Sequence, residues 1–69
     1  MKLYIVDLNL TNILEYSVAE YQVEVAANSA TQAEEMAEDH FKGQGKVQIL
    51  GTSMKSYFNI PGVITVGSR

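Results

Sequence analysis

The sequence predicts an α+β domain in which an antiparallel sheet of four strands, or five, carries one helix on one face. Three observations support this: alternating segments at residues 2–10 and 16–27, an amphipathic segment with clear end signals at residues 28–43, and extended segments after it. The predicted order is therefore β-β-α-β-β. The chain has 69 residues and is expected to form a single small domain, residues 1–69.

The first strand is predicted at residues 2–10, where both faces are apolar in the first half and polar residues alternate with apolar ones in the second. One face carries Tyr4, Val6, Leu8 and Leu10. Beyond this strand, Ile13 and Leu14 fall in a connection that either tucks them under the sheet or exposes them. If they are exposed, we expect them to form a contact patch.

The second strand is predicted at residues 16–27, which alternate clearly between apolar and polar side chains. The face expected to meet the helix carries Ala19, Tyr21, Val23, Val25 and Ala27. Glu20 and Glu24 fall on the opposite face. Because other acids lie on the helix, we expect negative charge on both sides of the sheet and not in one continuous stripe.

The helix is predicted at residues 28–43, the only segment whose start, period and end all agree. Ser29 is the expected N-cap, and Gln32 three residues later can complete a capping box. Gly43 supplies the left-handed residue that ends the helix, and Gly45 is expected to loosen the exit. One narrow arc carries the apolar residues Ala30, Ala33, Met36, Ala37 and Phe41, together with His40. The alanines are expected to let the helix approach the sheet closely.

The opposite face of the predicted helix is acidic, and its four acids are the candidate partner-binding residues: Glu34, Glu35, Glu38 and Asp39. Glu34 with Glu38, and Glu35 with Asp39, are like-charge pairs four residues apart, each unfavourable by about 0.2 to 0.5 kcal/mol. Only Glu38 with Lys42 is a favourable pair at that spacing. We infer that this face was not selected for helix stability alone.

The remainder of the chain is expected to be extended. Residues 46–50 predict a third strand, and Gly51 with its neighbours predicts a turn or bulge. Two more extended segments are expected at residues 54–60 and 63–66, joined by a type II corner at residues 61–62. The last segment is short, uncharged and apolar. At a sheet edge it would invite pairing with another chain, which favours a dimer. The strand order stays open at this stage.

Charge is distributed unevenly along the chain. All eight acids lie in residues 1–39 with one lysine, about −7 (1 − 8), whereas residues 40–69 carry four cations and no acid, about +4. One interpretation is that the two parts pack together and pair their charges across strands. The other is that an acidic and a basic surface face different partners, or face each other in an oligomer.

Residue types that carry chemistry are scarce. The chain has no cysteine and one histidine, His40, which we expect to be a half-buried packing residue rather than a general base or a ligand. Residues 43–46 look like a phosphate loop only superficially, because they follow a helix and lead into a strand. We therefore expect no enzyme activity, no metal site and no cofactor.

The composition also bears on partners and location. Direct binding to nucleic acid is disfavoured, because five cations without clustering would release few counterions. Asp7 and Asn9 interrupt the apolar runs near the N-terminus, so we expect neither a signal peptide nor a membrane span. Met1 suggests a complete gene product, and a cytoplasmic location is expected.

The leading hypothesis for function is a small acidic, non-enzymatic protein-protein interaction module, acting as a homodimer or binding another protein. It follows from the like-charge helix pairs, the apolar last strand and a core that at this size typically leaves about 3 to 5 kcal/mol of stability. The alternative is an acidic inhibitor or accessory protein that blocks a basic nucleic-acid-binding partner. In size, acidity and lack of cysteine the chain is similar to small inhibitor and accessory proteins that phages encode. An enzyme using His40 ranks last.

Overall fold

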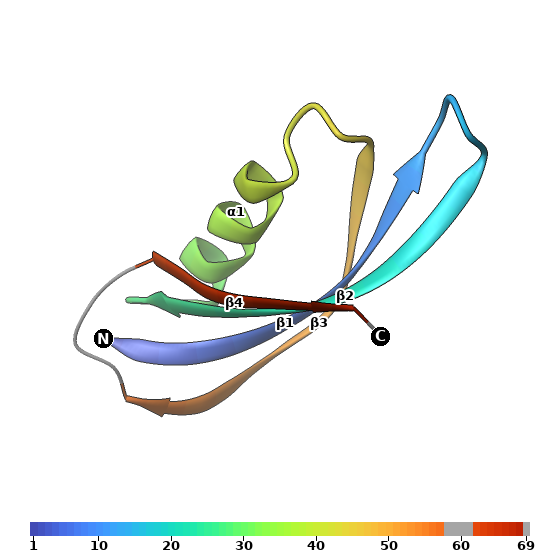
Figure 1. Ribbon diagram of the computed structural model, residues 1–69. Helices are drawn as coiled ribbons and strands as arrows, with labels where there is room; N and C mark the ends of the chain where they lie inside the picture. Colours follow the sequence, from blue (N-terminus) through green and yellow to red (C-terminus); the bar gives the residue numbers. More distant parts are fainter. Residues whose placement is uncertain (58–61, 69) are drawn as a thin grey trace.

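The fold is a four-stranded antiparallel sheet with one helix on one face (Figure 1). The computed structural model describes residues 1–57 and 62–68. In chain order the elements are β1 (Lys2–Asn12), β2 (Ser17–Ala27), α1 (Ala30–His40), β3 (Lys46–Tyr57) and β4 (Gly62–Ser68). The strands lie side by side in the order β3-β1-β2-β4. The predicted α+β class and the order β-β-α-β-β are confirmed, with four strands.

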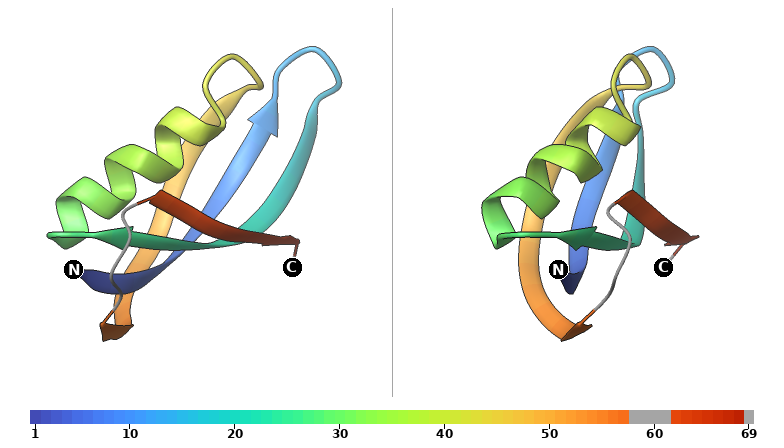
Figure 2. Two further views of the ribbon diagram at one scale, coloured as in Figure 1. Left: turned by 60° about the vertical axis from the view of Figure 1, so that its left-hand side comes forward. Right: turned by 90° about the vertical axis from the view of Figure 1, so that its left-hand side faces the viewer.

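The β1–β2 hairpin forms the centre of the sheet. Its register runs without a shift from the pair Lys2–Ala27 to the pair Asn12–Ser17. The sheet twists strongly, and the connection between β1 and β2 lies at the same end of the molecule as the connection between α1 and β3 (Figure 2). These two connections therefore stand close to each other, although they are far apart in the sequence.

The core lies between α1 and the face of the sheet that it covers. The buried strand residues on this face are Tyr4, Val6, Leu8 and Leu10 from β1 and Val23, Val25 and Ala27 from β2. Ala33, Ala37 and Phe41 complete the core. The alternation predicted for both strands is thus confirmed. Burying a valine or leucine side chain fully stabilises the fold by roughly 1.5 to 3 kcal/mol, so these positions carry much of the stability.

The start of α1 follows the predicted N-cap signal, except that Gln32 accepts from Asn28 and not from Ser29, whereas the helix ends at His40 and not at the predicted Gly43. Ser29 Oγ accepts from the backbone N–H of Gln32 at 3.1 Å, and Gln32 Oε1 accepts from the backbone N–H of Asn28 at 2.7 Å. At the other end Phe41 is the C-cap, and Gly43 has a positive φ of 86°. Side-chain capping of this kind satisfies amide groups that the helix leaves without partners.

β3 is one continuous strand, so its predicted division into two extended segments is wrong. Two register shifts relative to β1 leave Leu50 and Lys55 as extra residues. A bulge of this kind adds one residue and bends the strand without ending the ladder, which explains why Gly51 does not stop it. The bulge expected near Gly51 is present. The predicted corner at residues 61–62 includes Pro61, which lies outside the described residues.

β3 and β4 are the two edges of the sheet. β4 pairs with β2 from Ala26–Gly62 to Tyr21–Ser68. The strand order, which the sequence left open, therefore places the uncharged last strand at an edge.

No helix in the described part of the chain is long and apolar enough to cross a membrane.

Candidate functional site

The connection between β1 and β2, residues 13–16, exposes large apolar side chains. Ile13 is 64% exposed, Leu14 92% and Tyr16 90%. We call these three residues, together with Glu15 between them, the hairpin tip. Scattered single apolar residues are normal on a protein surface, but three within four residues at the end of a hairpin are typical of a contact surface. Of the two alternatives for Ile13 and Leu14, the structure shows the exposed one.

Local hydrogen bonds fix the backbone of the hairpin tip. Asn12 Oδ1 accepts from the backbone N–H of Leu14 at 3.0 Å and from that of Glu15 at 3.2 Å. An asparagine side chain that accepts from the following amides imitates a backbone turn. Tyr16 has a φ of 53°, a left-handed conformation that costs an L-residue roughly 1 to 2 kcal/mol. The three apolar side chains are therefore displayed from a defined turn.

An open cleft of about 650 Å³ lies between the hairpin tip and residues 43–45 of the α1–β3 connection. Leu10, Ala19 and Tyr21 also line it. Ala19 and Tyr21 belong to the face of the sheet that we expected the helix to cover, whereas Leu10 is buried in the core. An 11-residue helix is about 16 Å long, whereas an 11-residue strand extends for about 36 Å. The helix is therefore too short to cover the far end of the hairpin.

Aromatic contacts support the base of this cleft. The rings of Tyr21 and Phe41 lie 4.9 Å apart between centroids, and Phe41 is buried. His40 makes an edge-to-face contact with Phe41 at 5.0 Å. His40 itself is exposed, so the predicted half-buried packing position is wrong. The helix ends at His40, and its side chain turns outward while Phe41 fills the core.

The far wall of the cleft depends on a close approach between two backbones. A Cβ atom at Gly45 would collide with the backbone oxygen of Thr11. Only glycine therefore lets the α1–β3 connection lie against the end of β1. The connection is also held by the backbone N–H of Gln44, which donates to the carbonyl oxygen of Phe41 at 3.0 Å. The sequence predicted that Gly45 loosens the helix exit, but not this contact.

The four candidate acids on α1 do not form one surface. Thr52 Oγ1 on β3 donates to Glu34 Oε2 at 3.0 Å in a partly buried position, so Glu34 is tied to the sheet. Glu35, Glu38 and Asp39 are exposed. Three of the four predicted residues are therefore accessible to a partner, and none of the four lines the cleft at the hairpin tip.

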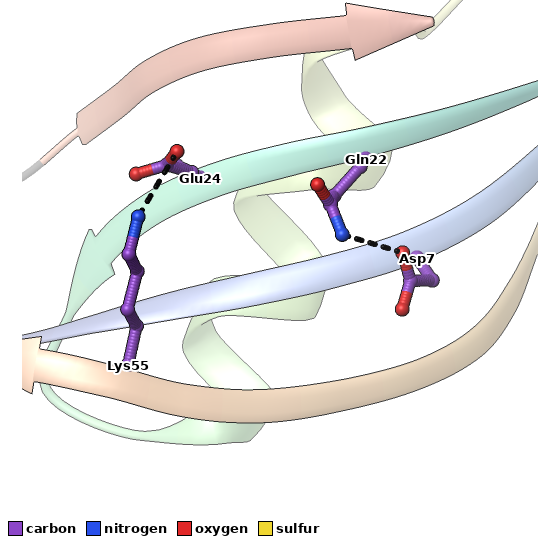
Figure 3. A network of polar contacts seen from close by, with 4 residues as sticks. All are labelled: Asp7, Gln22, Glu24 and Lys55. Carbon is purple, nitrogen blue, oxygen red and sulfur yellow. Dashed lines mark hydrogen bonds and ion pairs between the residues drawn. The ribbon is translucent and has the colours of Figure 1, made fainter. Parts of the chain in front are cut away.

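Polar contacts cross the face of the sheet that lies away from α1 (Figure 3). Lys55 Nζ on β3 lies 3.6 Å from Glu24 Oε1 on β2, and so spans the central strand β1. Gln22 Nε2 donates to Asp7 Oδ1 at 3.4 Å. The Lys55–Glu24 pair joins the acidic and basic parts of the chain, as the first interpretation of the charge distribution expects. Both side chains are partly exposed to solvent, so the pair contributes only about 0 to 1 kcal/mol.

Within residues 1–57 and 62–68, no group of three or more His, Asp or Glu side chains could hold a metal ion. No protein-family model, curated protein or solved structure matches the chain. Its function is therefore inferred from its own surface.

Proposed function

We propose that this protein is a non-catalytic protein-binding module whose binding surface is the hairpin tip with the adjoining cleft. The observation that carries the proposal is the exposure of Ile13, Leu14 and Tyr16 on a turn fixed by Asn12. Burying a large apolar side chain is favourable by roughly 1.5 to 3 kcal/mol, and tyrosine is enriched among the residues that dominate interfaces. In the free protein these side chains are exposed to water, so the free energy of burying them is gained only when a partner binds.

The fixed turn favours a role in binding over simple exposure. Ordering a flexible loop on binding opposes association by about 0.5 to 1.5 kcal/mol for each immobilised side chain, whereas a turn that is already ordered avoids part of that loss. Asn12 provides this order in the free chain. The left-handed Tyr16 also costs stability, and such strain is commonly found at functional positions.

The chemistry of the surface indicates the partner. Leu10, Ala19 and Tyr21 beside the hairpin tip can receive an apolar side chain. Among the residues that the structure describes, Glu15 is the one charged residue that lines the cleft, and no lysine or arginine occurs in the sequence from residue 3 to residue 41. We therefore expect the partner to present an apolar residue flanked by a basic one. Charge complementarity of this kind sets specificity and association rate more than affinity.

Selection from a random peptide display library tests this proposal. The immobilised protein is expected to enrich peptides that combine a large apolar residue with lysine or arginine. Leu14→Asp should raise the dissociation constant of the selected peptides by about tenfold or more, because it places a charge in the interface. Leu50→Asp is the matched control, since Leu50 is also an exposed leucine, at 51%, but lies on β3. No enrichment, or equal loss in both variants, would contradict the proposal.

The exposed acids on α1 favour a second candidate function, an acidic inhibitor that occupies the basic surface of a nucleic-acid-binding protein. Its binding residues would be Glu35, Glu38 and Asp39, without Glu34, whose carboxylate accepts from Thr52. Reversing these three charges should abolish such binding, and the complex should weaken steeply as salt rises. Leu14→Asp should leave it unchanged, which separates the two candidates.

A further inference from the structure

We propose that two copies of this chain pair through the outer edge of β4, so that two sheets join into one antiparallel sheet of eight strands. This surface is separate from the hairpin tip, and the inference therefore goes beyond the proposed function. It rests on the strand order, the charge of the two edges and the pairing of β4 with β2.

The two edges of the sheet differ in how well they are protected against pairing with another chain. β3 carries Lys46 and Lys55 and has two bulges relative to β1. Lysine residues and bulges are the features by which edge strands resist pairing with other chains. β4 has the sequence GVITVGS, without charge or proline. Its one register shift lies between Val63 and Thr65, and residues 65–68 pair regularly with β2. The described part of β4 therefore has a regular, uncharged edge.

A second copy of the chain fits this edge by symmetry. Two identical antiparallel strands are related by a two-fold axis perpendicular to the sheet, so the same edge serves both copies. The strand order becomes β3-β1-β2-β4-β4-β2-β1-β3, with both helices on one face. Both outer edges of this assembly are then the protected β3. The pairing therefore closes at two copies and does not propagate.

Side chains on β4 agree with such a pairing. Val66, opposite the buried Val23, is 39% exposed on the helix side of the sheet, and a neighbouring strand would cover part of it. Gly67, opposite Gln22, is exposed on the other side. No charge on β4 takes part, so the dimer should depend little on salt, unlike a complex formed through the acids of α1.

Sedimentation equilibrium of the full chain at about 0.1 M and about 1 M salt tests the pairing. The wild-type protein is expected to be a dimer at both salt concentrations. Gly67→Lys places a charge at the edge and should raise the dimer dissociation constant by about tenfold or more. Gly67→Ala is the matched control and should behave as wild type, because a Cβ at Gly67 would meet the backbone oxygen of Gln22 at an ordinary 3.7 Å.

A wild-type monomer at high concentration, or a dimer equally strong in both Gly67 variants, would overturn the inference. Dissociation by Leu14→Asp would also overturn it, because the contact would then lie at the hairpin tip. Hydrogen exchange needs no substitution and covers the case in which Gly67→Lys fails to fold. Those amides of residues 65–68 that point to the outer edge should become more protected as protein concentration rises, and unchanged protection would count against the pairing. Peptide binding by Gly67→Lys tests the hairpin tip separately.

Discussion

At the residue scale, two residues near the cleft determine the path of the backbone beside it. Asn12 holds the turn of the hairpin tip through two hydrogen bonds. Gly45 lets the opposite wall approach Thr11. Neither residue has a large apolar side chain that could dominate an interface itself. Their substitution should therefore change the shape of the site while leaving its apolar side chains in place.

Gly45→Ala should destabilise the fold by about 1 to 3 kcal/mol, because the new Cβ meets a backbone atom that cannot rotate away. Urea unfolding measures this change. Gly51→Ala is the control: a Cβ at Gly51 would have no atom within 4 Å, so the stability of this variant should change little. Equal stabilities for the two variants would show that the α1–β3 connection does not depend on the close approach.

Asn12→Ala should lower the free energy of unfolding by about 0.5 to 1.5 kcal/mol and increase the mobility of residues 13–16, because two amides lose their acceptor. Asn12→Asp keeps an acceptor oxygen and should retain the turn. Backbone relaxation measured by NMR distinguishes the two variants. If the tip amides are equally ordered in Asn12→Ala and wild type, the turn is not held by this side chain.

At the element scale, α1 is capped well but has an unfavourable outer face. Ser29 and Gln32 satisfy amides at its start. Of its four clustered acids, only Glu34 has a hydrogen bond to the described part of the sheet, from Thr52. The like-charge pair Glu35 and Asp39 is exposed. The helix thus owes its stability to Ala33, Ala37 and Phe41 in the core rather than to its surface.

Glu35→Lys should raise the free energy of unfolding by about 0.4 to 1 kcal/mol at low salt, because a repulsive pair with Asp39 becomes attractive. The gain should shrink as salt rises. Glu34→Lys should show no such gain, since it also removes the hydrogen bond from Thr52. Thermal unfolding at two salt concentrations measures both. A destabilised Glu35→Lys would mean that Glu35 has a structural role on this face.

At the scale of the whole molecule, local patterns in the sequence predicted the elements but not their arrangement. The alternation around Val6 and Val23 identified the core face, because period-2 burial is a local property. The order of the strands depends on contacts between distant segments, and no local pattern encodes it. The edge position of β4 therefore required the structure.

The candidate site was predictable only in part. Ile13 and Leu14 were recognisable as apolar residues in a connection, but their exposure depends on how far α1 reaches along the hairpin. Comparing the lengths of an 11-residue helix and an 11-residue strand would have indicated the uncovered end. The cleft itself also needs the approach of Gly45 to Thr11, a contact between segments far apart in the chain.

The most direct test of the central claim is photo-crosslinking from the hairpin tip in the cells that make this protein. A photoreactive amino acid replaces Leu14 in one variant and Leu50 in the other, since both positions are exposed and apolar. Irradiation is expected to join a second protein to position 14 and not to position 50. The same products from both positions, or none from position 14, would contradict a binding surface at the hairpin tip.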